Sequence, residues 1–266
     1  MTIQVPADVL TRGCVRVDVS GSQSGVVTVT LDRPDARNAQ TPATWAALDV
    51  IGQALEDAPV SLVVIRGAGS AFSAGLDRRM FTPDGVPGET SLAAMTAMAD
   101  AQFADQIGIF QRGFTWQRRV RALTVAAVQG PAVGAGFQLA LACDMLIATP
   151  EATFAMRETS YGLVPDLGGT QPLVRAVGYA RAVDICATGR AVTAAEGYAL
   201  GFVTRVVDDL DAAVDELASV VGETPPGAVA DVLALLSKAE EATRDEQLVE
   251  ERTAQVRRLR NLLGGS

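Results

Sequence analysis

The apolar positions of the first two hundred residues fall into short runs that are separated by longer amphipathic segments. Two of the runs, 14–19 and 26–31, alternate apolar with polar or small residues around the turn 20–25, which predicts a β-hairpin. Strands are predicted at 14–19, 26–31, 62–65, 124–128, 145–148 and 153–155. Helices are predicted from Pro42, which Thr41 caps, to about Glu56, and within 92–121.

From Thr170 onward the strand signals fade and helical periodicity dominates. Helices are predicted at 171–177, 180–188, 193–200, 210–220, 228–239 and 241–263. The pattern therefore predicts an α/β core over 1–200 followed by a helical C-terminal region over 201–266.

Composition and charge narrow the function classes. The 266 residues carry a net charge of −9, which argues against nucleic acid as a partner. Histidine is absent, so Ser-His-Asp and Cys-His machinery, His-bearing zinc sites and a histidine base are excluded.

The cysteines and the apolar runs bear on the compartment. Cys14, Cys143 and Cys186 show no CxxC spacing and are expected to be buried thiols in a reducing compartment. No apolar run approaches the ~20 residues that span a bilayer, and residues 1–11 do not resemble a signal peptide. We expect a cytoplasmic protein with no membrane partner.

Two glycine-rich loops, 67–77 and 134–136, each follow an apolar run. Neither fits the G-x-G-x-x-G dinucleotide fingerprint, because Phe72 and Leu139 stand at the third glycine position. A turn followed by a helix that opens at about Ala135 leaves unpaired N–H groups at the positive end of the helix dipole. Two such loops can supply one N–H each to a single oxygen, although glycine in such turns is also used for conformational freedom alone.

Three stretches resemble signatures of the crotonase (enoyl-CoA hydratase/isomerase) superfamily. They are 72–77 (Phe-Ser-Ala-Gly-Leu-Asp), the block 130–144, and 161–170 (Tyr-Gly-Leu-Val-Pro-Asp-Leu-Gly-Gly-Thr). Segments 32–39 and 197–203 are similar to its CoA-contact loop and its A-x-x-x-G-L-V segment. The resemblance implies a spiral of ββα units, a C-terminal trimerisation region, a homotrimer or dimer of trimers, and acyl-CoA substrates with no metal and no separate cofactor.

The resemblance also assigns binding positions. It places the backbone N–H groups of Leu76 and Ala135 at an oxyanion hole for the thioester oxygen. Substrate or CoA contacts are expected from Arg33, Ala36, Ala74, Asp77, Arg78 and Gly134. Surface arginines are also commonly just solvated, and that alternative stays open here.

The expected catalytic residues are Glu158, Asp166 and Gln138. Hydratases of the superfamily carry glutamates at the positions of Gln138 and Glu158, and a carboxamide cannot exchange a proton. Loss of one partner of such a pair removes ~10²–10⁴-fold of rate. Double-bond isomerisation with Glu158 as proton shuttle is therefore favoured over a weakened hydratase or a non-catalytic acyl-CoA-binding protein.

Two roles stay open. Asp166 matches the second carboxylate of dienoyl-CoA isomerases, whose motifs the chain resembles most, but it could equally form a local Asx-turn. Gln138 could orient a group in the site or serve as a structural amide.

Overall fold

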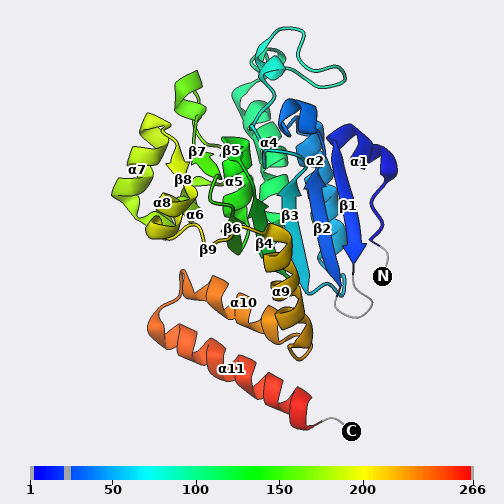
Figure 1. Cartoon of the computed structure of the whole chain (residues 1–266), viewed down its shortest axis with the longest axis vertical. Helices are drawn as coiled ribbons and strands as arrows, with labels where there is room; N and C mark the ends of the chain where they lie inside the picture. The colour runs from blue at the N-terminus through cyan, green and yellow to red at the C-terminus, as the bar shows by residue number, and fades with distance from the viewer. Residues whose placement is uncertain (1–2, 21–24, 265–266) are drawn as a thin grey trace.

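A six-stranded sheet forms the centre of the molecule. The computed structural model describes residues 3–20 and 25–264, so most of the predicted turn 20–25 lies outside the described residues. The strand order is β1-β2-β3-β4-β6-β9 (Figure 1). Its strands are β1 (Val15–Ser20), β2 (Val26–Leu31), β3 (Leu62–Gly67), β4 (Leu123–Val128), β6 (Met145–Ala148) and β9 (Arg205–Val206).

The direction of these strands places the functional loops. β1 pairs antiparallel with β2, as the predicted hairpin requires, and β2, β3, β4, β6 and β9 are mutually parallel. The carboxyl ends of parallel strands share one sheet edge, where ligands bind in open α/β sheets. The loops after β2, β3 and β4, which carry the predicted oxyanion-hole and substrate-contact residues, therefore leave from the same edge.

Helices cover both faces of the sheet. They are α1 (Ala7–Gly13), α2 (Pro42–Leu55), α3 (Leu92–Met95), α4 (Asp100–Gln111), α5 (Ala135–Ala142), α6 (Thr170–Val177), α7 (Tyr179–Thr188), α8 (Ala194–Leu200), α9 (Leu210–Glu223), α10 (Ala228–Ala239) and α11 (Arg244–Leu263). Short 3₁₀ turns are η1 (Pro34–Ala36), η2 (Arg78–Phe81), η3 (Arg112–Phe114), η4 (Trp116–Arg118) and η5 (Glu158–Tyr161).

Each face of the sheet has its own apolar core. On one face Val27, Val29 and Ile65 pack with the buried side of α2. On the other face Val64 and Val125 pack under Leu217 of α9. Strands buried on both faces explain why 62–65 and 124–128 are continuous apolar runs rather than alternating ones.

The helix starts follow local capping. Thr41 caps α2 and Pro42 stands in its first turn, as predicted, and Thr44 completes a capping box that was not predicted. Thr243 and Glu246 form another, so α11 begins at Arg244 rather than at 241.

Three expectations from the sequence need correction. Segment 92–121 is broken into α3, α4, η3 and η4. The break at η3 occurs where the chain packs on α2, because an added Cβ at Gly113 would lie only 2.6 Å from the carbonyl oxygen of Trp45 in that helix. The glycine loop after β4 contains the strand β5 (Pro131–Val133), which joins β7 (Thr153–Ala155) and β8 (Val192–Thr193) in a second sheet. The helical region also contains β8 and β9, two residues each, which are too short to show a periodic pattern.

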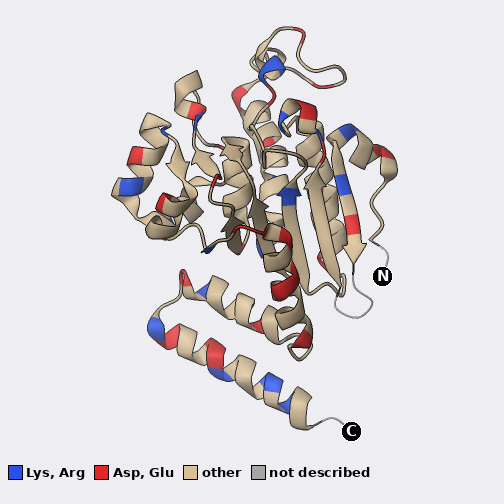
Figure 2. Ribbon diagram, in the orientation of Figure 1, with Lys and Arg blue, Asp and Glu red and all other residues tan. Residues whose placement is uncertain are grey.

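The last two helices lie outside the main body. α10 lies beside the lower part of α9, α11 runs antiparallel to α10 beneath it, and α11 carries charges of both signs along its length (Figures 1 and 2). Several apolar side chains of this pair remain exposed: Val232, Leu236, Leu248, Val249, Val256, Leu259, Leu262 and Leu263. Within the described residues, no helix combines the length and the apolar character needed to cross a membrane.

Candidate active site

Two loops meet at the carboxyl edge of the sheet. Ser73 pairs with β5 as a short parallel bridge, since its N–H donates to Pro131 O (3.0 Å) and its carbonyl accepts from Val133 N–H (2.9 Å). Gly75, at φ +85°, fits because an added Cβ would lie 2.5 Å from Val133 O and 3.6 Å from Ala135 N. The backbone after Gly75 is therefore held beside the start of α5.

The two predicted oxyanion-hole positions lie side by side in this arrangement. Over 3–20 and 25–264, the backbone N–H groups of Leu76 and Ala135 donate to no protein acceptor. Ala135 is the first residue of α5, whose dipole adds positive potential there. Free, adjacent and preorganised N–H donors can hold one developing negative oxygen.

A buried polar network that the sequence analysis missed supports this segment. Gln40 is fully buried; its N–H donates to Gly75 O and its carbonyl accepts from Asp77 N–H, both at 2.8 Å. Its side-chain amide donates to Ser73 Oγ (3.0 Å), and that hydroxyl accepts from Gly75 N–H (3.1 Å). The only signal in the sequence is that position 40 is polar, directly before the Thr41 cap.

Glu158 lies next to the oxyanion segment. Gly134 N–H donates to Ala155 O (2.8 Å), which ties the start of α5 to the strand that leads to Glu158. An added Cβ at Gly134 would lie 3.3 Å from Glu158 Oε1. Burial raises the pKa of Glu158. Hydrogen bonding from its own backbone N–H, and then from Gln138, opposes that rise, and the charge of Asp166 adds to it.

Gln138 is 1% exposed and lies in the first turns of α5. Its Nε2 donates to Glu158 Oε1 at 2.7 Å. Its Oε1 accepts from Leu167 N–H (3.0 Å) and Gly169 N–H (3.2 Å). The amide is thus bonded both to backbone and to the predicted base.

Asp166 lies at the same site, on the segment that Gln138 binds. It is half-buried, and burial raises the pKa of its carboxyl group. Its backbone carbonyl accepts from Gln111 Nε2 (2.7 Å), which fixes the segment. The charge of Asp166 acts on Glu158, so the two carboxyl groups share one environment.

The predicted substrate-contact residues line the neighbouring loops. Asp77 is engaged by Arg33 Nη1 and Arg79 Nη2, both at 2.8 Å, and it caps η2 through Arg79 N–H. These arginines, Arg79 first, hold the pKa of Asp77 well below its usual range. Ala74 N–H donates to Arg37 O (2.8 Å), which joins the loop after β3 to the one after β2, where Ala36 ends η1.

Side chains of η2 and η5 contact one another. Phe81, at the end of η2, stacks on Tyr161, at the end of η5, with ring centroids 5.7 Å apart. The Arg78 guanidinium lies over the Tyr161 ring at 5.9 Å. Of the two arginines predicted to contact substrate, Arg78 packs on the ring of Tyr161 and Arg33 forms an ion pair with Asp77.

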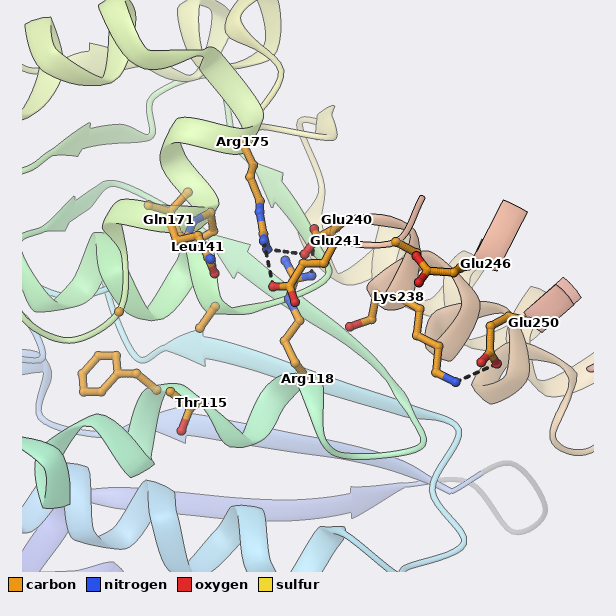
Figure 3. A pocket seen from close by; sticks show the side chains of 16 residues that line it. Thr115, Arg118, Leu141, Gln171, Arg175, Lys238, Glu240, Glu241, Glu246 and Glu250 are labelled. Atoms are coloured by element: carbon orange, nitrogen blue, oxygen red, sulfur yellow. Dashed lines mark hydrogen bonds and ion pairs between the residues drawn. The ribbon is translucent and has the colours of Figure 1, made fainter. Parts of the chain in front are cut away.

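A separate cavity of about 780 Å³ lies between the body and the α10–α11 pair (Figure 3). Leu141 of α5 and Gly168 line it, so it is adjacent to the segment that Gln138 binds, but Glu158 does not line it. Arg118 and Arg175 both contact Glu240, which joins α10 to the body. Among the described residues, no group of three or more Cys, Asp or Glu side chains is arranged to hold a metal ion.

Known proteins resemble this chain in sequence and in fold. A Thermobifida fusca protein assigned as an enoyl-CoA hydratase, solved in complex with acetoacetyl-CoA, is 41% identical, with 96% of this chain and 98% of that chain covered and a TM-score of 0.90. A Mycobacterium bovis protein assigned as an enoyl-CoA hydratase is 35% identical over 231 residues, 84% of this chain and 82% of that protein. The mitochondrial Δ3,5-Δ2,4-dienoyl-CoA isomerase of Rattus norvegicus is 31% identical over 212 residues, 78% of this chain and 63% of that protein.

The family profile described as enoyl-CoA hydratase/isomerase matches residues 21–263. The profile, the relatives and the fold agree with the superfamily resemblance of the sequence. The chain therefore belongs to the enoyl-CoA hydratase/isomerase family, within the crotonase superfamily.

Proposed function

We propose that the protein isomerises the double bond of unsaturated acyl-CoA thioesters, with Glu158 as the proton shuttle. One observation carries this proposal: the second acid–base position of the site is Gln138, whose amide is committed to Glu158 and to two backbone N–H groups. Hydration needs a group that activates water and another that protonates carbon, whereas a bond shift needs one base that removes and returns a proton.

The proposed reaction starts at the thioester. Its oxygen is held by the N–H groups of Leu76 and Ala135, and Glu158 removes a proton from the carbon next to the carbonyl. The electrons of that C–H bond form an enolate, whose negative oxygen the two donors stabilise. The same proton then returns at the γ carbon as the double bond moves, and Glu158 is again a carboxylate. The Thermobifida fusca structure with acetoacetyl-CoA supports an acyl-CoA ligand.

The experiment is a panel of 3-enoyl-CoA, 2,4-dienoyl-CoA and 3,5-dienoyl-CoA thioesters followed by chromatography. We expect bond migration that Glu158→Gln abolishes; unchanged turnover in that variant refutes the proposed role. Tight acyl-CoA binding with no turnover on any thioester would instead support a non-catalytic binding protein.

Hydration is the second candidate, because relatives such as the Mycobacterium bovis protein carry that assignment. If only the missing carboxylate limits hydration, Gln138→Glu should raise the hydration rate on 2-enoyl-CoA by ~10²-fold or more. An unchanged hydration rate in a folded Gln138→Glu variant would count against this candidate.

We also propose that the chain assembles as a homotrimer or a dimer of trimers through its C-terminal region. The apolar residues left exposed on α10 and α11, such as Leu236 and Leu259, support an interface there. Sedimentation equilibrium tests this assembly, and a monomer at micromolar concentration would refute it.

A further inference from the structure

The Gln138 side chain can adopt only one orientation at its site. Its carbonyl oxygen must face the N–H groups of Leu167 and Gly169, because an NH₂ group there would oppose two donors. The NH₂ group must therefore face the Glu158 carboxylate. An added Cβ at Gly169 would lie 2.6 Å from Gln138 Cγ, so the backbone also packs directly against the side chain.

This bond makes the two oxygens of Glu158 unequal. Oε1 accepts from Gln138 Nε2 at 2.7 Å, while Oε2 is buried and has no hydrogen-bond partner within the described part of the chain. A buried oxygen without a partner at a reactive site is poised to bind a proton that a substrate delivers. Oε1, already engaged, is the poorer proton acceptor.

We infer that Gln138 is a positioning residue that makes Oε2 of Glu158 the single proton-carrying atom of the site. Through Leu167 and Gly169 it also fixes the segment that holds Asp166, so the one amide positions both carboxyl groups. The inference rests on the proposed function for its kinetic test, but the geometry of the carboxylate can be tested without turnover.

The decisive variant is Gln138→Met, which keeps a similar volume and removes both the donor and the acceptor. We expect kcat to fall about 10- to 100-fold, as for a lost hydrogen bond to a charged group, with KM little changed. The acid limb of the kcat/KM profile should move to higher pH, because the lost bond had favoured the charged carboxylate. Gln117→Met is the matched control: Gln117 is also 1% exposed and donates to a backbone carbonyl, but it has no bond to Glu158.

A merely structural role for Gln138 would leave the pH profile unchanged, and that result in a folded Gln138→Met overturns the inference. If Gln138→Met does not fold, Gly169→Ala serves instead, since its Cβ must displace Gln138; its profile should move in the same direction, and an unmoved profile refutes the inference.

A second measurement separates the inference from the proposed function. The Glu158 carboxyl carbon, labelled with ¹³C and assigned by its loss in Glu158→Gln, is titrated by NMR in wild type and Gln138→Met. A titration that moves to higher pH in the variant supports the inference even if no thioester is turned over, in which case only the proposed function fails. A titration that does not move overturns the inference even if isomerisation is observed.

Discussion

Gly136 packs tightly between the two loops that carry the proposed oxyanion donors, and this contact allows a quantitative test. Gly136 lies in the first turn of α5, and an added Cβ would stand 2.7 Å from both the Cβ and the carbonyl oxygen of Ser73. Non-bonded carbon atoms prefer about 3.5–4.0 Å. In Gly136→Ala, α5 and the loop after β3 must therefore move apart by about 1 Å.

That movement separates the two N–H donors. An oxyanion hole needs both donors within about 2.7–3.1 Å of the same oxygen, and Leu76 and Ala135 stand on the two parts that move. A shift of about 1 Å removes one donor from reach, which costs ~10²–10³-fold in kcat, or about 2.7–4 kcal/mol. We expect this loss in kcat for the best thioester substrate of the panel, measured by stopped assay alongside thermal unfolding and circular dichroism.

Gly108→Ala provides the control substitution. Gly108 is exposed on α4, and an added Cβ there would meet no atom within 4 Å. It should keep wild-type kcat and gain up to about 1 kcal/mol of stability from helix propensity. A folded Gly136→Ala variant whose kcat stays within threefold of wild type would refute the assignment of these two N–H groups.

Three further perturbations test the charges around the site. Because burial raises the pKa of Glu158 in the folded state, the charged carboxylate lowers the stability of the fold as pH rises through that pKa. Glu158→Gln should therefore stabilise the fold by about 0.5–2 kcal/mol at pH 7.5 and by little in acid. Equal gains in stability at both pH values would contradict this reasoning. The pKa of Asp77 is lowered in the folded state, so its ion pairs stabilise the fold at neutral pH and lose that effect as pH falls. Asp77→Asn should lower the free energy of unfolding, measured in denaturant, by about 1.5–3 kcal/mol at pH 7 and by less near pH 3. Glu240→Gln removes ion pairs that join α10 to the body and should lower the free energy of unfolding by about 0.5–1 kcal/mol. Amide hydrogen exchange should become faster in α10 and α11 but not in β3. An equal increase in exchange throughout the chain would count against this docking role.

Local pattern was sufficient for the elements that build the scaffold. The apolar runs at 62–65 and 124–128 and the Thr41 cap are properties of neighbouring residues, and β3, β4 and the start of α2 follow them. The start of α5 at Ala135 was also predictable, because a strand followed by a glycine turn and small residues signals a helix N-terminus.

Contacts between distant segments could not be predicted in this way. β5 exists because Ser73 and Ala155 lie on either side of it, and no periodicity within three residues can show that. The Gln40 network joins position 40 to position 73, and nothing in the neighbouring residues indicates that this amide is buried. The sequence resemblance placed Gln138 and Glu158 in one site, but the amide orientation depends on Leu167 and Gly169.

In the proposed site, backbone groups bind the oxyanion and side chains transfer the proton, so the side chains can change while oxyanion binding is kept. The proposed oxyanion donors are backbone N–H groups held by glycine geometry at 75, 134 and 136, so side-chain substitutions elsewhere should leave them in place. The proton chemistry depends instead on what stands 2.7 Å from Glu158 Oε1. An amide at this position donates a hydrogen bond to Glu158 and favours its charged form as the single base. A carboxyl group at this position would have to share a proton with Glu158, because two carboxyl groups this close cannot both ionise. We therefore expect a single exchange at position 138 to convert the proposed one-base site into an acid–base pair without moving the proposed oxyanion hole.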